Sequence, residues 1–219
     1  MKYLFLGLFI GFIYIIYYTY CSTTLEAFTS KNIVLLGDSI LKNNSYVSDG
    51  NSVEDIIVER NKNALCLAED HSKIIDIYNQ INKISIDFNS PNTLIFLSAG
   101  GNDILSYYVD QKQDTTDTSV LKPMFSSYKK VVQSIQNKLP EVKIVLLDIY
   151  YPENLQYKQF HSIIKEWNNM VYEFSENPKN KIYKIIRISS HLTKPEDFTF
   201  GIEPSSNGGK KIADLILSI

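Results

Sequence analysis

Two short polar segments, each following an apolar run, carry side chains suited to acyl-transfer chemistry. The first is Gly37-Asp38-Ser39-Ile40 and the second is Gly100-Gly101-Asn102-Asp103. A serine at a strand-to-helix turn can expose its hydroxyl, while backbone N–H groups and an asparagine amide can stabilise a developing oxyanion. Either segment alone also fits helix capping or ordinary turn formation. Together they predict a serine-centred hydrolase site with three oxyanion donors, namely Ser39, Gly101 and Asn102.

The elements that would position these residues alternate between strands and helices. Short continuous apolar runs, typical of strands buried on both faces, occur at 33–36, 64–67, 93–97, 142–147 and 182–188. Helical spacing of apolar residues occurs at 72–84, 120–139, 155–174 and 209–219. This alternation predicts parallel βαβ units and a three-layer α/β/α sandwich with about five strands. Ligands of such sheets bind beyond the carboxyl ends of the strands, where both polar segments lie.

The two segments, in this order, resemble the first and third sequence blocks of the SGNH hydrolase superfamily, also called GDSL esterases and lipases. The resemblance extends over nearly the whole domain, from Gly37 to the last helix. It implies a flavodoxin-like α/β/α fold, a small-molecule ester or acylated glycan as substrate, and no metal or organic cofactor. In that family the first block supplies the nucleophilic serine, matched here by Ser39. The third block supplies an oxyanion-hole asparagine, matched by Asn102.

The sequence departs from the family in its other two blocks. The family's last block is Asp-x-x-His-Pro, whereas here Phe200 stands at the aspartate position and Glu203 at the histidine position, before Pro204. The second block normally offers a glycine N–H, but residues 67–72 contain no glycine, and Asp70 or His71 stands there. The usual histidine base and its aspartate partner are therefore absent.

Three hypotheses accommodate these substitutions. Glu203 is the general base if burial raises its pKa from about 4.3 toward roughly 6 to 7. Alternatively, His71 takes the Ser39 proton and Glu203 orients it, because geometry rather than chain order defines such triads. Finally, hydrolysis is lost and the domain binds a carbohydrate or acyl ligand without turnover. The leading hypothesis is an ester hydrolase in which Glu203 or His71 accepts the proton of the Ser39 hydroxyl.

The N-terminal segment from residue 3 to residue 20 carries no charge and is predominantly apolar. Eighteen helical residues span about 27 Å, close to the thickness of a bilayer's hydrocarbon core. We expect a membrane anchor over residues 1–21, a tether over 22–30 and the catalytic domain over 31–219. Lys2 favours a single-pass orientation with the domain on the non-cytoplasmic side. The alternative is a signal peptide that is cleaved, which would leave a secreted protein.

The charge and the cysteine content argue against a nucleic-acid-binding protein and against a domain built on a disulfide framework. The formal net charge is -2, and the basic residues are spread along the chain, so we expect no nucleic-acid partner. The two cysteines, Cys21 and Cys66, define no disulfide framework. His161 and His191 fall in a predicted helix and a predicted loop, where packing or surface roles are expected. Substrate specificity is expected to depend on loops such as 105–120.

Overall fold

The computed structural model describes residues 31–110 and 117–219. The predicted anchor and tether, with most of the polar loop at 110–119, lie outside the described residues. Within the described ranges, none of the helices combines the length and apolar character needed to span a bilayer. The prediction of an N-terminal membrane helix is therefore not tested by the structure.

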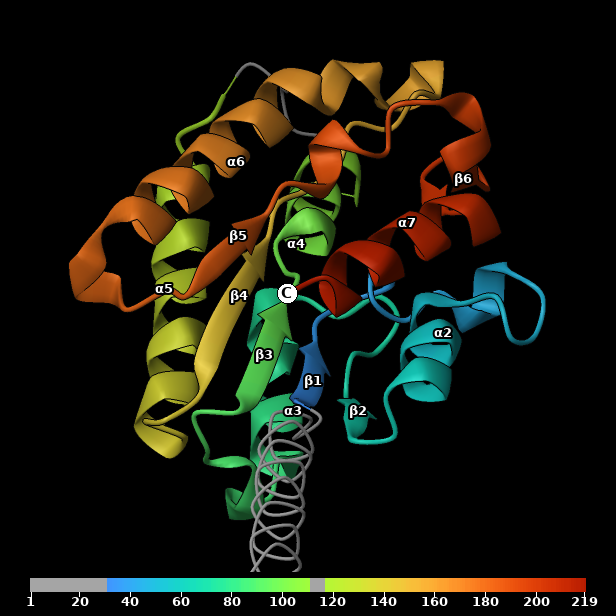
Figure 1. Cartoon of the computed structure of the whole chain (residues 1–219). Coiled ribbons are helices and arrows are strands. Elements are labelled where there is room, and N and C mark those ends of the chain that lie inside the picture. Colours follow the sequence, from blue (N-terminus) through green and yellow to red (C-terminus); the bar gives the residue numbers. More distant parts are fainter. Residues whose placement is uncertain (1–30, 111–116) are drawn as a thin grey trace, which may run out of the picture. The chain divides into compact units, whose positions relative to one another are not determined.

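A parallel sheet of five strands forms the centre of the domain (Figure 1). Its strands are β1 (Asn32–Leu36), β2 (Ala64–Cys66), β3 (Thr93–Leu97), β4 (Lys143–Leu147) and β5 (Lys184–Ile186). They lie in the order β2-β1-β3-β4-β5, and each neighbouring pair is parallel. This is the strand order of flavodoxin-like folds, and it confirms the prediction of a parallel sheet of about five strands.

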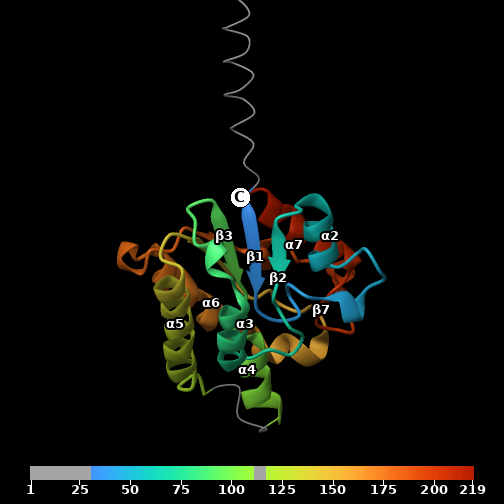
Figure 2. The ribbon, with the colours of Figure 1, turned by 90° about the horizontal axis from the view of Figure 1, so that it is seen from below.

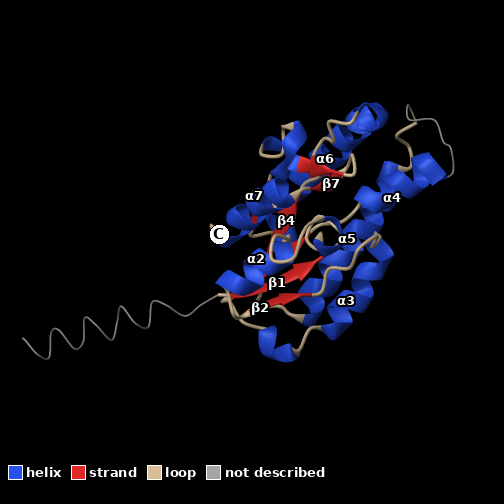
Figure 3. Cartoon of the chain, turned by 90° about the vertical axis from the view of Figure 1, so that its right-hand side faces the viewer, coloured by secondary structure: helices blue, strands red, loops and turns tan. Residues whose placement is uncertain are grey.

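Helices cover both faces of this sheet. They are α2 (Val53–Arg60), α3 (Ile77–Lys83), α4 (Gly101–Leu105), α5 (Leu121–Lys138), α6 (His161–Glu176) and α7 (Ser206–Leu217). Helices α3, α5 and α6 pack on one face, whereas α2 and α7 lie side by side on the other (Figures 2 and 3). The sandwich predicted from the alternation of strands and helices is therefore confirmed.

Successive residues of β1 show why the strands are apolar throughout. Val34 and Leu36 belong to the core beneath α3, α5 and α6, whereas Ile33 and Leu35 belong to the core beneath α2 and α7. Successive side chains of a strand point to opposite faces, so a sheet covered on both sides requires an apolar residue at every position. All four side chains are at most 3% exposed.

Several elements differ from the sequence-based expectation. The helix predicted over 72–84 is a short 3₁₀ turn followed by α3, and the strand predicted over 182–188 is only three residues long. Helix α2 was not expected, although the Ser52 hydroxyl accepts from the Asp55 N–H (2.9 Å) in a capping box at its start. Also unexpected was an antiparallel hairpin of two-residue strands, β6 (Phe198–Thr199) and β7 (Glu203–Pro204).

Candidate active site

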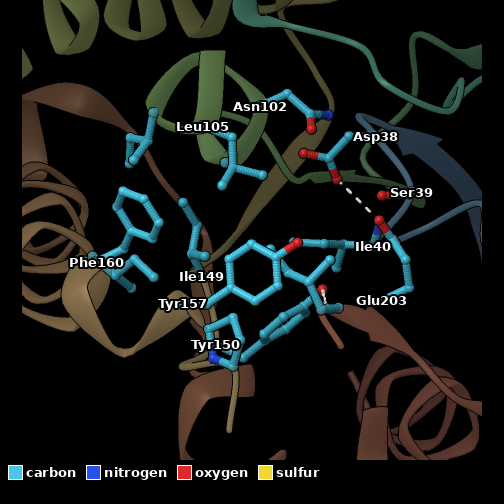
Figure 4. Close-up of a pocket in the computed structure, with 15 residues that line it drawn as sticks. Asp38, Ser39, Ile40, Asn102, Leu105, Ile149, Tyr150, Tyr157, Phe160 and Glu203 are labelled. Carbon is cyan, nitrogen blue, oxygen red and sulfur yellow. Dashed lines mark hydrogen bonds between the residues drawn. The ribbon is translucent and has the colours of Figure 1, made fainter. Parts of the chain in front are cut away.

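A pocket of about 550 Å³, including the part open to solvent, lies at the carboxyl edge of the sheet (Figure 4). Four of the residues singled out in the sequence line it, namely Ser39, Gly101, Asn102 and Glu203. They come from the turn after β1, from α4 after β3, and from β7. The fold therefore brings together segments that are more than 160 positions apart in the chain. His71 is not among the lining residues.

The turn that carries Ser39 requires glycine at position 37. Gly37 has a φ of +147°, and a Cβ built on it would lie 2.2 Å from the carbonyl oxygen of Ser98. Any side chain at this position would therefore force β1 and β3 apart. The close approach of the two backbones brings the ends of these strands next to each other.

A buried glutamine fixes both polar atoms of the Gly37 backbone. The Gly37 N–H donates to Gln80 Oε1 (2.8 Å), and Gln80 Nε2 donates to the Gly37 carbonyl (2.8 Å). The same Nε2 also donates to the Ser72 hydroxyl (3.1 Å). Because Gln80 is only 1% exposed, these bonds are shielded from water and hold the turn before Ser39 in place.

Asp38 is a buried carboxyl group next to the serine. Its Oδ1 accepts from the Ile40 N–H (3.1 Å) and from the Ser98 hydroxyl (3.0 Å), so it joins the tips of β1 and β3. Burial and, to a smaller extent, the negative charge of Glu203 raise the pKa of Asp38, and the hydrogen bonds lower it, with a net result of about 7. Asp38 therefore shapes the turn and also places a second carboxyl group in the pocket.

Groups that can donate to an oxyanion follow two strand ends, β1 and β3, in residues that line the pocket. Within the described part of the chain, the Ser39 N–H makes no hydrogen bond. Asn102 Nδ2 donates one of its hydrogens to the Ser72 carbonyl (3.0 Å), which orients the amide and leaves its second hydrogen for a ligand. Gly101 lies beside Asn102 at the start of α4. Ser39, Gly101 and Asn102 therefore line one pocket, and their role as oxyanion donors stays a prediction.

The start of α4 is positioned by a large aromatic side chain. Gly100 has a φ of +110°, and a Cβ at this position would lie 2.2 Å from Cζ2 of Trp167. Trp167 is a residue of α6, and its side chain is fully buried in the core on that face of the sheet. The indole ring therefore packs directly on the backbone that precedes Asn102.

The Glu203 carboxyl interacts with the Ser39 hydroxyl, and Figure 4 shows both residues on the same side of the pocket. Burial raises the pKa of Glu203, and the negative charge of Asp70 raises it further. Hydrogen bonding from Ser39 and the positive charge of His71 lower it, but the net shift is upward. Glu203 Oε2 is buried and has no hydrogen-bond partner in the described ranges. A carboxylate in this setting is a stronger base than an exposed glutamate.

Two side chains hold the backbone on either side of Glu203. The Tyr150 hydroxyl donates to the Ile202 carbonyl (2.7 Å), and Asn43 Nδ2 donates to the Pro204 carbonyl (3.0 Å). Asn43 Oδ1 in turn accepts from the N–H of Val53 at the start of α2 (2.8 Å). The β6–β7 hairpin is thereby fixed to the β1 turn and to the loop after β4. Neither Tyr150 nor Asn43 was singled out from the sequence.

The hairpin turn itself is strained. Phe200 adopts a φ of +48°, in the left-handed region that is unusual for a large side chain, and Gly201 follows with a φ of +85°. Phe200 is 73% exposed, and its ring makes an edge contact with Tyr46 at a centroid distance of 6.0 Å. The residue at the family's aspartate position is therefore an exposed aromatic side chain that contacts Tyr46 and lies outside the lining of the pocket.

His71 lies at the protein surface. Its side chain is 81% exposed, and Nε2 lies 3.6 Å from Oδ2 of Asp70. The same Asp70 oxygen accepts a hydrogen bond from the Tyr46 hydroxyl (2.7 Å). His71 is near enough to Glu203 to lower its pKa, but it does not line the pocket that contains Ser39. Of the two bases suggested by the sequence, Glu203 lines the pocket together with Ser39 and His71 does not.

The remaining histidines take part in other contacts. His161 Nε2 lies 2.8 Å from the Pro152 carbonyl, and His191 Nδ1 lies 3.1 Å from the Arg187 carbonyl. Among residues 31–110 and 117–219, no three His, Cys, Asp or Glu side chains come together in a way that could hold a metal ion.

Comparisons with solved structures show which class of protein shares this fold. A member of the lipolytic protein G-D-S-L family from Veillonella parvula has a TM-score of 0.63 and 18% identity, covering 85% of this chain and 96% of its own. The lipase Lip_vut3 from a goat rumen metagenome has a TM-score of 0.66 and 16% identity, with 85% and 95% covered. A family 3 carbohydrate esterase from Clostridium thermocellum has a TM-score of 0.60 and 17% identity, with 86% and 94% covered.

These likenesses establish the fold. The chain has the α/β/α fold of the GDSL, or SGNH, hydrolases over most of its length, as the resemblance of its sequence segments implied. No family model and no curated protein matches the sequence.

Proposed function

We propose that the protein is an SGNH-type serine ester hydrolase in which Ser39 is the nucleophile and Glu203 is the general base. The observation that carries this proposal is the placement of the Ser39 hydroxyl beside the Glu203 carboxyl, in the same pocket as Asn102. A hydroxyl, a proton acceptor and an oxyanion donor are the groups that acyl transfer requires. The GDSL lipases and the carbohydrate esterase that share the fold support ester hydrolysis as the general reaction.

The reaction proceeds in two halves. Ser39 Oγ attacks the acyl carbon while its proton passes to Glu203, and the Ser39 N–H and the Asn102 amide stabilise the oxyanion. The carbon–oxygen bond to the alcohol then breaks, and Glu203 gives its proton to the leaving oxygen. In the second half, Glu203 takes a proton from water, which attacks the acyl-enzyme. The acid is released, and the proton returns from Glu203 to Ser39.

A glutamate is suited to this role only in a setting that increases its basicity. Burial and the negative charge of Asp70 raise the pKa of Glu203, which brings it closer to neutral pH. Tyr150 and Asn43, which hold the carbonyl groups of the two flanking residues, keep the carboxyl in place. In this site they take over the orienting function that an aspartate has for the family's histidine.

Turnover of a small aryl ester tests the proposal. The purified full-length protein should hydrolyse the ester, and Ser39→Ala should reduce kcat at least ~1,000-fold, as expected on loss of a nucleophile. Ser127→Ala, which changes an exposed serine on α5, serves as the matched control and should retain wild-type activity. Equal rates for Ser39→Ala and wild type would contradict the proposal. An inert wild type that nevertheless binds an ester would instead support the alternative of a binding domain without turnover.

We also propose that residues 3–20 anchor the enzyme in a membrane, with the hydrolase domain on the non-cytoplasmic side. The proposal is supported by the uncharged, apolar sequence of that segment and by the position of Lys2 before it. Alkaline carbonate extraction of cell membranes tests it. An anchored protein stays in the pellet and retains its N-terminal residues in mass spectrometry. A protein that begins after residue 20 and is found in the medium would show that a signal peptide has been cleaved.

A further inference from the structure

The part of the pocket on the side away from Ser39 and Glu203, called the inner part below, is lined mainly by carbon. We infer that this inner part binds the acyl chain of the substrate, and that the preferred esters carry acyl chains longer than acetyl. The inference rests on the proposed function and adds the chemical class of the substrate to it. Its inner wall consists of Leu105, Ile149, Pro152, Tyr157, Phe160 and Ile164.

The wall is built by three separate segments that follow β3 and β4. Leu105 ends α4, Ile149 lies just after β4, and Phe160 and Ile164 lie at and after the join between a 3₁₀ helix (Leu155–Phe160) and α6. Ile149, Phe160 and Ile164 are each at most 6% exposed, so their positions are fixed by the core. Figure 4 shows Leu105, Ile149 and Phe160 on the side of the pocket away from Ser39 and Glu203.

The charged groups of the pocket lie at its Ser39 end, outside the inner part. The charged residues among its lining are Asp38 and Glu203, which both lie beside Ser39. Tyr150 also lines the pocket, but its hydroxyl donates to the Ile202 carbonyl and is therefore engaged. A sugar would need several hydrogen-bonding groups around its hydroxyls, and five of the six inner-wall side chains have none. An alkyl chain requires only the exclusion of water.

Proton transfer from Glu203 to the leaving oxygen determines on which side of Ser39 the alcohol and the acyl chain of the ester lie. Glu203 must reach the leaving oxygen to protonate it, so the alcohol lies on the Glu203 side of the reacting carbon. Tyr46, Asp70 and His71 lie near Glu203 on that side, and Phe200 contacts Tyr46, so the side offers a hydroxyl, a carboxylate, an imidazole and an aromatic ring. The acyl group must then extend the opposite way, into the part lined by Leu105 and Phe160.

Chain-length dependence of turnover tests this inference. The substrates are p-nitrophenyl acetate, butyrate, hexanoate and octanoate, assayed with the full-length protein. As long as each added methylene is buried in the pocket, it should raise kcat/KM about fourfold, so butyrate, with two more methylenes, should exceed acetate by roughly 15-fold. Leu105→Trp fills the inner part and should lower the ratio of hexanoate to acetate kcat/KM at least about tenfold. The control is Leu155→Trp, at a side chain that is 80% exposed and outside the lining, and it should leave that ratio unchanged.

Two results would overturn the inference. One is a preference for acetate, or no dependence on chain length, in the wild type. The other is an equal effect of Leu105→Trp on acetate and hexanoate turnover.

Binding without turnover separates this inference from the proposed function. Calorimetric titration of the Ser39→Ala protein should show tighter binding of methyl octanoate than of methyl acetate, and adding Leu105→Trp should abolish the difference. If wild type hydrolyses no ester but methyl octanoate still binds more tightly than methyl acetate, the proposed reaction is wrong and the inference of an acyl-binding pocket is supported. Equal binding of the two esters would contradict the acyl pocket whatever the turnover.

Discussion

The carboxyl group of Glu203 lies beside the hydroxyl of Ser39 in a pocket that also contains Asp38 and Asn102 and is lined elsewhere mainly by apolar side chains. In the SGNH proteins that the sequence resembles, a histidine occupies the position of Glu203. A glutamate that replaces it must have a raised pKa and a fixed orientation to act as a base near neutral pH. Burial supplies the first condition, and the bonds from Tyr150 and Asn43 to the flanking carbonyls supply the second.

Replacing the base should be as informative as replacing the nucleophile. Glu203→Gln keeps the size of the side chain but removes the proton acceptor, so kcat for a small aryl ester should fall roughly 100- to 10,000-fold. Glu69→Gln is a suitable control, because Glu69 is exposed and pairs with Lys83 (2.6 Å) away from the pocket. Steady-state kinetics provide the measurement. Activity of Glu203→Gln within about tenfold of wild type would show that another group accepts the proton.

The pH dependence should report the raised pKa of Glu203. The base acts as a carboxylate, so kcat/KM should fall as pH falls through that pKa, which lies above the ordinary 4.5 of a glutamate. Asp70→Asn removes a negative charge that raises the Glu203 pKa, and an amide oxygen still accepts the bond from Tyr46. The acid limb of the profile should therefore move to lower pH. A limb that stays in place, or moves to higher pH, would contradict the electrostatic account.

Changing His71 should shift the same limb in the opposite direction. The positive charge of His71 lowers the pKa of Glu203, so His71→Gln should move the acid limb to higher pH. On the alkaline plateau the rate should stay within about threefold of wild type, because the side chain is exposed and outside the pocket. A loss of about 100-fold or more on that plateau would make His71 the base instead.

The turn before Ser39 should tolerate no side chain at position 37. Gly37→Ala would place a methyl group 2.2 Å from the Ser98 carbonyl oxygen, so we expect the free energy of unfolding to fall by about 3 kcal/mol or more. Gly50→Ala is the matched control: Gly50 also has a positive φ (+79°), but beyond its chain neighbours no atom lies within 4 Å of the place its methyl group would take. That change should cost only about 1 kcal/mol. Urea denaturation gives both values, and equal costs would contradict the steric argument.

Much of the fold could be predicted because the pattern of apolar residues is local. Runs such as 33–36 and 93–97 are apolar at nearly every position, which only a strand covered on both faces requires. The hairpin of β6 and β7 could not be found in this way, because two-residue strands are too short to show a period of two. The same holds for the five residues of α4, which are too few to show a helical period.

The site was only partly predictable. Ser39 and Asn102 lie in short glycine-containing segments that directly follow apolar runs, and this pattern identifies them in the sequence as residues at strand ends. No such pattern identifies Gln80, Asn43 and Tyr150. Their hydrogen-bond partners are backbone atoms that lie 43, 161 and 52 positions away in the sequence. Only the assembled fold shows that these residues hold the serine turn and the glutamate in place.

Labelling with a serine-reactive phosphonate tests the pairing of Ser39 and Glu203 most directly. An alkyl phosphonate ester with an aryl leaving group should add one covalent adduct, and peptide mass spectrometry should place it on Ser39. The rate of labelling should fall at least about 100-fold in Glu203→Gln, because the hydroxyl loses its proton acceptor. An adduct on a different serine, no adduct at all, or an undiminished rate in Glu203→Gln would contradict the account.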